Sequence, residues 1–234
     1  MADRPILFSA PMIRALLAGT KTQTRRLIKP QPPAHTTCAG FFSTGSFGWM
    51  AGDPADLESW EFLGDFKTPI SGGDRLWVRE TWSGLHQFRN TPPALRESFS
   101  TPDGVVIRED VWLWADGSPS VGDWEKPRPG IHMPRWASRL TLTVTDVRVE
   151  RLQDISEDDA VAEGADIAEG HRSQITGGPM VKVGPGTYMS PIAWYHRLWN
   201  EINGTGAWET NPWVVAYTFT VHHGNIDQIA QVAA

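Results

Sequence analysis

The stretch Gly19-Thr20-Lys21-Thr22-Gln23-Thr24-Arg25-Arg26 decides how this chain is interpreted, because it joins a turn glycine to three reactive side chains in the spacing G-x-K-x-x-T-x-R. Residues 11–18 before it begin with proline and carry an apolar stripe, which predicts a short helix that ends at Gly19. Residues 24–28 after it are predicted to be extended. Since residues i and i+2 of a strand share a face, Thr24 and Arg26 are expected to point one way and Arg25 outward. Lys21, on the turn, can then reach Thr24.

These residue types suit the hydrolysis of an amide. A threonine hydroxyl becomes a nucleophile when a base removes its proton, and lysine acts as that base when burial or a nearby cation lowers its pKa. Glu80 shares a strand face with the apolar Leu76 and Val78, so its carboxylate is expected to be paired or to have a raised pKa. We therefore consider Lys21 as base, Thr24 as nucleophile and Glu80 as acid, with no metal or cofactor required.

Each of these residues also has a purely structural interpretation. Thr24 is a common strand former, Lys21 after a turn glycine is often a solvated cation, and Glu80 could form an ordinary salt bridge with Arg79. The seven histidines lack the spacing of a metal site. The residues alone therefore leave catalysis and structure open.

The chain has 234 residues and a net charge of −6, with 21 Lys and Arg against 27 Asp and Glu. Proteins that bind duplex nucleic acid usually carry a basic field, so the overall charge argues against a general nucleic-acid binder. A local basic patch still surrounds the motif: Lys21, Arg25, Arg26 and Lys29. The lone Cys38 and the lack of a long apolar stretch favour a cytoplasmic protein with no membrane partner.

The chain contains 12 tryptophans and only three tyrosines. Tryptophan buries a large area, so most of these rings are expected in the core, and a minority near the motif could stack on a nucleobase. Arg135 and Trp136 illustrate the choice, since they could form a base-stacking wall or Trp136 could simply pack beneath a barrel.

The remaining pattern predicts an α+β fold: a small mixed barrel, flanked by short helices, in a single domain spanning residues 1–234. Strands are expected at 6–9, 75–82, 139–152 and 213–221, and helices at 156–162 and 191–203. The hydrophobic phase of the strand 139–152 changes near residue 145, which predicts a bulge or bend. Three irregular insertions are expected at about 31–69, 83–130 and 168–190, the second with a hairpin through 105–107 and 111–114.

The last predicted strand alternates strictly. Trp213, Val215, Tyr217, Phe219 and Val221 are expected to point inward, and Val214, Ala216, Thr218 and Thr220 outward. The tail after His222 is expected to fray.

The motif around Lys21 resembles the signature of the ASCH domain family, a branch of the PUA-like β-barrel folds. The stretch Leu76-Trp77-Val78-Arg79-Glu80-Thr81-Trp82, preceded by Gly72-Gly73-Asp74, is similar to that family's second strand region. Residues 132–139 and 211–214 are similar to longer phage- or prophage-associated members. The similar stretches cover about half of the chain.

Some bacterial ASCH proteins are amidohydrolases that remove the acyl group from N4-acetylcytidine and related N4-acylated cytosines. The resemblance implies that Lys21, Thr24 and Glu80 fall on that family's catalytic residues. It also implies that Arg26 helps to hold the substrate or the developing oxyanion. The other substrate-contact candidates are Ser9, Trp77, Arg135 and Trp136.

Two classes of function thus remain in view. The first is an amidohydrolase acting on a small nucleoside or nucleobase, and the second is a PUA-like module that binds RNA or a modified base without turnover. Metal-independent ribonuclease action, which uses the same basic pocket, is a third possibility. The presence of Lys21, Thr24 and Glu80 together, and the acidic net charge, favour the enzyme. The sequence leaves the oligomeric state open.

Overall fold

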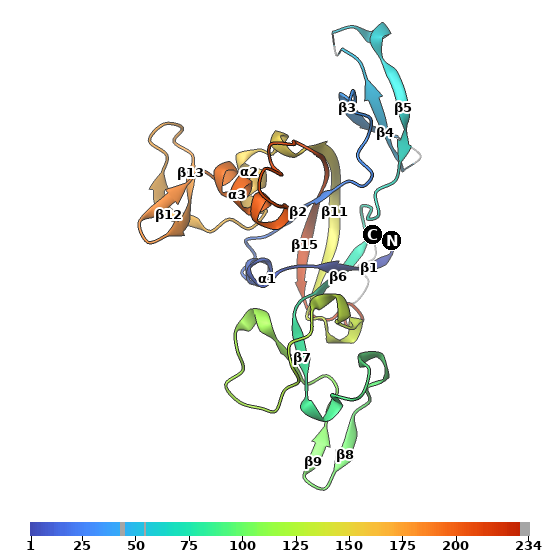
Figure 1. The fold of residues 1–234 in the computed structure, drawn as a ribbon, viewed down its shortest axis with the longest axis vertical. Helices are drawn as coiled ribbons and strands as arrows, with labels where there is room; N and C mark the ends of the chain where they lie inside the picture. Colours follow the sequence, from blue (N-terminus) through green and yellow to red (C-terminus); the bar gives the residue numbers. More distant parts are fainter. Residues whose placement is uncertain (43–44, 54, 230–234) are drawn as a thin grey trace. The chain divides into compact units, whose positions relative to one another are not determined.

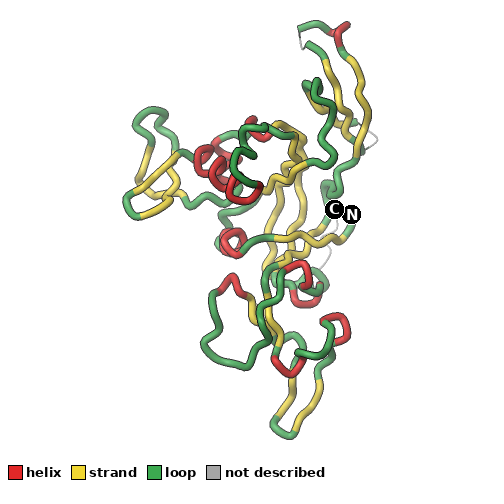
Figure 2. The backbone as a smooth tube through the Cα atoms, in the orientation of Figure 1, coloured by secondary structure: helices red, strands yellow, loops and turns green. Residues whose placement is uncertain are grey.

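The computed structural model describes residues 1–42, 45–53 and 55–229. Strands and loops make up most of these residues and helices are few (Figures 1 and 2), so the protein is of the predicted α+β class. It consists of two compact units, which we describe separately. Unit 1 comprises the described residues within 1–19, 73–144 and 220–229, and unit 2 comprises those within 20–72 and 145–219.

Unit 1 is built on a small mixed sheet. Its strand β1 (Asp3–Leu7) runs parallel to β6 (Arg75–Arg79), and β6 pairs antiparallel with the start of β11 (Leu140–Arg151). The helix α1 (Ala10–Leu17) follows β1, and Gly19 beyond it has φ of +72°, a conformation that glycine adopts without strain. The predicted helix and its glycine end are therefore confirmed.

The segment 83–130 of unit 1 is more ordered than predicted. Its strands are β7 (Trp82–Gly84), β8 (Phe99–Thr101), β9 (Gly104–Val106) and β10 (Val111–Leu113). Strand β7 pairs with β10, and β8 with β9 (Figure 1, green). The predicted hairpin is wrong, because its two strands belong to different pairs. Short 3₁₀ helices lie at His86–Phe88, Pro93–Leu95, Trp114–Asp116, Gly130–His132 and Arg135–Ala137.

A buried arginine organises this segment. Arg96 is 1% exposed, and its Nη2 donates to both carboxylate oxygens of Glu125, at 2.7 and 2.9 Å. Its Nε donates to the carbonyl of Thr91 at 3.1 Å, and its guanidinium lies 5.4 Å from the ring centres of both Trp82 and Phe88. A charge buried this deeply is tolerated only because it is paired.

Unit 2 is built on strands β2 (Gln23–Leu27), β15 (Trp213–His223) and the second part of β11, in the order β11-β15-β2. Strand β11 passes from unit 1 into unit 2 between residues 144 and 145, where the hydrophobic phase changes. A 3₁₀ helix (Leu152–Asp154) and the helices α2 (Glu157–Ala162) and α3 (Pro191–Asn203) follow. Ser156 and Ser190 cap the two helices with their hydroxyls, so both helix predictions are confirmed.

Strand β15 is buried on both faces within unit 2. Val214 and Ala216 are fully buried, although the alternation predicts them outward. Val214 packs in a cluster with Leu152, Tyr195 and Trp199, because α2 and α3 cover its face of the strand. The outward prediction is therefore wrong for these two residues.

The other two predicted insertions also form sheets. Residues 38–66 contain β3 (Cys38–Phe41), β4 (Phe47–Ala51) and β5 (Glu61–Phe66), with a 3₁₀ helix at Leu57–Ser59 (Figure 1, blue to cyan). Residues 167–189 contain β12 (Ile167–Arg172), β13 (Pro179–Gly184) and β14 (Thr187–Met189). Sequence lacking a sustained period thus folds here as short antiparallel strands.

Two further expectations differ from the structure. Asn225 and Ile226, in the tail expected to fray, are buried, and Asn225 Nδ2 donates to the carbonyls of Arg135, Trp136 and Ser138. Residues 230–234 lie outside the described residues.

The described strands form open sheets, and among them no closed barrel is found.

We predict that Glu125→Ala destabilises the protein by about 3–5 kcal/mol, because it leaves the Arg96 guanidinium buried and unpaired. The matched control is Glu109→Ala, which removes an exposed partner from Arg108 and should cost less than about 1 kcal/mol. Urea unfolding followed by tryptophan fluorescence measures both. Equal losses in the two variants would contradict the structural role of the Arg96–Glu125 pair.

Candidate functional site

Strand β2 presents the motif residues on two different faces. Thr24 lies directly opposite Tyr217 of β15, and Arg26 lies opposite Val215. Residues directly opposite in an antiparallel pair point to the same side, so these four residues share one face of the strand pair. The prediction that Thr24 and Arg26 point the same way is confirmed.

Lys21 is fully buried, so the solvated-cation interpretation is wrong. It forms an isolated antiparallel bridge with Glu163, at the C-terminal end of α2. Its Nζ donates to the carbonyl of Gln23, to the carbonyl of Glu163 and to Glu163 Oε2, each at 2.8 Å. Burial lowers the pKa of Lys21 below 10.5, against the opposing effect of the Glu163 carboxylate.

Arg25 points to the opposite face from Thr24, as predicted, but it is buried at 4% exposure. Its guanidinium forms ion pairs with Glu150 (2.7 Å), Asp159 (3.0 Å) and Glu163 (3.3 Å). Since Glu163 also binds Lys21, one carboxylate joins two of the three cations of the motif, Lys21 and Arg25. The predicted basic patch is therefore partly an internal ion network.

A tyrosine from α3 completes the surroundings of Glu163. Tyr195 is 3% exposed, its hydroxyl lies near the Glu163 carboxylate, and the Arg25 guanidinium lies 5.9 Å from its ring centre. Burial and the Glu163 carboxylate raise the pKa of Tyr195 well above 10, so the phenol keeps its proton. The described contacts of Glu163 thus include Lys21, Arg25 and Tyr195.

Glu80 lies in unit 1 and is held there by Arg139. The guanidinium donates to both carboxylate oxygens of Glu80 at 3.0 Å, and it also binds Asp116 at 2.7 and 2.9 Å. Burial raises the pKa of Glu80, although Arg139 opposes the rise. The Glu80 carboxylate was expected to be paired or to have a raised pKa, and both are observed. The partner is Arg139, whereas the Arg79 guanidinium lies 4.3 Å from the ring centre of Trp77. The catalytic role of Glu80 stays a prediction.

The remaining predicted contact residues are engaged within unit 1. Arg135 forms ion pairs with Asp3 and Asp227, and Trp136 packs edge-on against Trp82 with ring centres 6.0 Å apart. Trp136 belongs to the core cluster around Met133. Of its two interpretations, packing is therefore the one that the contacts support.

Ser9 and Trp77 also have local roles in unit 1. Ser9 occupies the N-cap position of α1, where its carbonyl accepts from the backbone N–H of Ile13. Trp77 is 7% exposed on β6, beneath Arg79. These local contacts do not test whether Ser9 and Trp77 contact a substrate, which stays a prediction.

Unit 2 contains a pocket of about 590 Å³ beside Arg26, on the face of β2 that Arg26 shares with Thr24, although Thr24 itself is only 2% exposed. Residues from β2, β5 and β15 line it together with the loop after β2, and Arg26, Val215 and Tyr217 are among them. Its aromatic walls include Trp49 and Phe66, whose rings stack with centres 4.1 Å apart. This volume is in the range of small-molecule sites.

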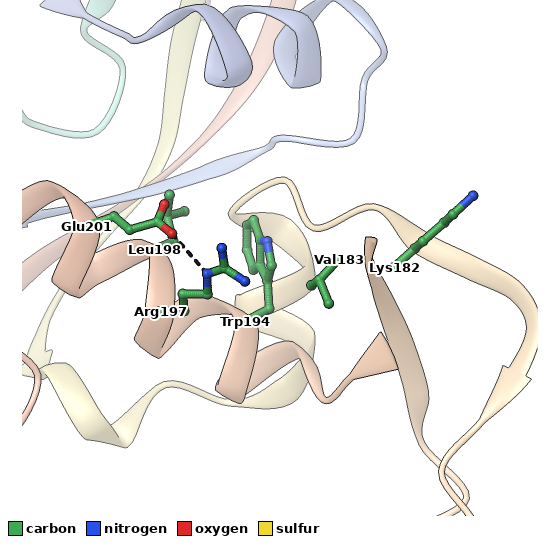
Figure 3. Close-up of a pocket in the computed structure, with 6 residues that line it drawn as sticks. All are labelled: Lys182, Val183, Trp194, Arg197, Leu198 and Glu201. Atoms are coloured by element: carbon green, nitrogen blue, oxygen red, sulfur yellow. Dashed lines mark hydrogen bonds and ion pairs between the residues drawn. The ribbon is translucent and has the colours of Figure 1, made fainter. Parts of the chain in front are cut away.

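A smaller hollow of about 260 Å³ lies between α3 and β13 (Figure 3). An Arg197–Glu201 ion pair and the indole of Trp194 line it, and Lys182 points away from them in the figure. It contains none of the predicted site residues. We therefore place the candidate site in the larger pocket.

Among the described residues, His, Cys, Asp and Glu side chains form no cluster that could hold a metal ion. Among those residues, no helix combines the length and apolar character needed to cross a membrane. Comparison with known proteins finds no matching family model, curated protein or solved structure.

Sequence reasoning missed Glu163. One feature of the sequence could have indicated it. A carboxylate at the C-terminal end of a helix interacts unfavourably with the helix dipole, so Glu163 needs a cationic partner. Lys21, its partner, is 142 residues away in the chain, and nothing in the spacing relates the two.

We predict that Asp159→Asn destabilises unit 2 by about 1–3 kcal/mol at pH 7, because Asp159 accepts from Arg148 and Gln23 and pairs with Arg25. Burial opposes ionisation, but these partners lower the pKa of Asp159 below 3.8. Stability from a lowered carboxylate pKa is present above the unfolded value and is lost as pH falls through the folded one. The difference from wild type should therefore shrink below pH 3.8.

Urea midpoints at neutral and acidic pH measure this effect. Asp158→Asn is the matched control, since Asp158 is exposed in the same first turn of α2 and contributes the same charge to the helix N-terminus. A loss that stays constant down to about pH 3, or an equal loss for Asp158→Asn, would contradict the ion network.

Proposed function

We propose that this protein is a metal-independent amidohydrolase that removes the acyl group from N4-acylated cytosine nucleosides or bases. Thr24 is the nucleophile, Lys21 the base, and Glu163 the carboxylate that orients Lys21. The observation that carries the proposal is the buried Lys21–Glu163 pair, in which Lys21 precedes the strand segment that carries Thr24 and Arg26. The resemblance to the ASCH family and its PUA-like fold is part of this proposal.

Burial supports the role of Lys21 as a base. A lysine with a lowered pKa is neutral in a larger fraction of molecules at a given pH, and only the neutral amine can accept a proton. Lys21 Nζ then takes the proton of the Thr24 hydroxyl, and the threonine oxygen bonds to the amide carbonyl carbon.

The rest of the cycle uses the same groups. The carbonyl C–N4 bond breaks, and N4 leaves with the proton held by the Lys21 ammonium. Lys21 next takes a proton from a water molecule, and the water oxygen attacks the carbonyl carbon of the threonyl ester. The same proton is then donated to the Thr24 oxygen as the carboxylic acid departs. Glu163 stabilises the ammonium form in each half-cycle.

The pocket supports a flat, polar substrate. Arg26 lines it beside Tyr217, and a guanidinium there is suited to hold a carbonyl oxygen as negative charge develops. The aromatic walls formed by Trp49 and Phe66 suit a pyrimidine ring.

A binding module without turnover is the second candidate. One specific observation favours it: the Lys21 ammonium has three donors, and three acceptors lie at 2.8 Å from it. Such an amine is well placed to stabilise the fold. In this case the pocket would bind RNA or a modified base and leave the amide intact.

We predict that the purified protein converts N4-acetylcytidine to cytidine in the presence of a chelator, as followed by chromatography. Thr24→Ala and Lys21→Arg should be inactive, since arginine stays protonated and cannot act as a base. Glu163→Gln should lower kcat by about 100-fold or more, because it removes the carboxylate that orients Lys21.

The control for Thr24→Ala is Thr22→Ala at an exposed position of the same motif, which should behave as wild type. Loss of activity in Glu80→Gln with full activity in Glu163→Gln would overturn the role of Glu163 and support Glu80 as the acid. Absence of turnover on a panel of N4-acyl cytosines would move the conclusion to the binding module.

We also predict that kcat/KM rises about tenfold per pH unit until Lys21 is neutral, with an inflection below pH 10.5. Because the Glu163 carboxylate raises the pKa of Lys21, the residual activity of Glu163→Gln should show its inflection at a lower pH than wild type. A merely structural role for Glu163 would lower the rate without moving the inflection. A wild-type kcat/KM that does not rise with pH anywhere in the range in which the protein stays folded would argue against Lys21 as the base.

A further inference from the structure

The rim of the 590 Å³ pocket in unit 2 is positively charged, in contrast to the whole chain. Three of its lining residues are cationic and one is acidic: Arg26, Lys29, Lys67 and Asp65. The chain carries a net charge of −6, so this local excess of cations is not an average property of its surface. A concave site with one sign of charge concentrates ligands of the other sign.

Lys29 and Lys67 differ from the buried cations of the motif in their surroundings. Both are exposed, and within the described residues neither lysine forms an ion pair with a carboxylate. They differ in this respect from Lys21 and Arg25, whose charges are buried against acidic partners. Lysine ammonium groups kept in solvent at the edge of a pocket remain available for an anion.

The two lysines belong to different segments that meet at the pocket. Lys29 follows β2, the strand that carries Thr24 and Arg26, and Lys67 follows β5, whose last residue is Phe66. Lys67 is therefore adjacent in sequence to the aromatic wall, and Lys29 follows the motif strand. A ligand that satisfies both features has a planar ring and an attached anion.

We propose that this pocket binds a phosphorylated cytosine compound, with Lys29 and Lys67 as phosphate contacts. The phosphate belongs either to a mononucleotide or to a nucleic-acid strand, which share this chemistry. The identity of the base rests on the proposed function, whereas the anion rests on the charge of the rim alone.

The test compares binding and turnover. Cytidine 5′-monophosphate, cytidine and a short single-stranded oligocytidylate are titrated into the wild-type protein by calorimetry, and N4-acetylcytidine is compared with its 5′-monophosphate as substrate. We expect the phosphorylated forms to bind at least about tenfold more tightly and to have a correspondingly lower KM, with kcat unchanged.

Lys29→Ala and Lys67→Ala should each weaken binding of the phosphorylated forms about fivefold and leave cytidine unaffected. Lys182→Ala is the matched control, an exposed lysine of the same unit outside this pocket, and should change neither. Added salt should weaken binding of the nucleotide more than that of the nucleoside.

The outcomes separate the two proposals. Lysine-dependent binding of the nucleotide without hydrolysis of any N4-acyl substrate would uphold the phosphate site and overturn the amidohydrolase. Hydrolysis with equal KM values for nucleoside and nucleotide, or equal losses in Lys67→Ala and Lys182→Ala, would overturn the phosphate site and leave the enzyme standing. Tighter binding of the oligonucleotide than of the mononucleotide would identify the strand as the source of the phosphate.

Discussion

The buried carboxylate of Glu163 is the constraint on which unit 2 depends. It accepts from Lys21 at 2.8 Å and pairs with Arg25 at 3.3 Å, and both cations are almost completely removed from solvent. Burying an ammonium and a guanidinium beneath the helices costs several kcal/mol unless their charges are balanced. Glu163, with Glu150 and Asp159, provides this balance and ties α2 to the motif strand.

This network explains why β2 can have two different faces. Gln23 and Arg25 face the acidic groups of α2 and β11, so their polar atoms are satisfied inside the protein. Thr24 and Arg26 face the other way, on the side of the aromatic pocket. Because β2 is buried on one side by ion pairs, the Arg26 side chain that lines the pocket on the other side is carried by a fixed strand.

Several local elements could be predicted from the sequence because their causes are local. The helices α1 and α3 start at proline-containing turns, Ser156 caps α2, and Gly19 ends α1 with a positive φ. The short strands of 38–66 and 167–189 escaped prediction, since strands of three to six residues carry too few alternations to form a pattern. The burial of Val214 and Ala216 also escaped prediction, because alternation reports one buried face and cannot report that helices cover the second.

The sequence by itself determined which side chains share a strand face and where helices begin and end, because these properties depend on residues a few positions apart. It also predicted that the Glu80 carboxylate would be paired or would have a raised pKa. Only the tertiary structure decided which partner that is, Arg139, and which carboxylate meets Lys21. The Lys21–Glu163 pair is separated by 142 residues, and its formation depends on how β2 and α2 pack, which no local pattern encodes.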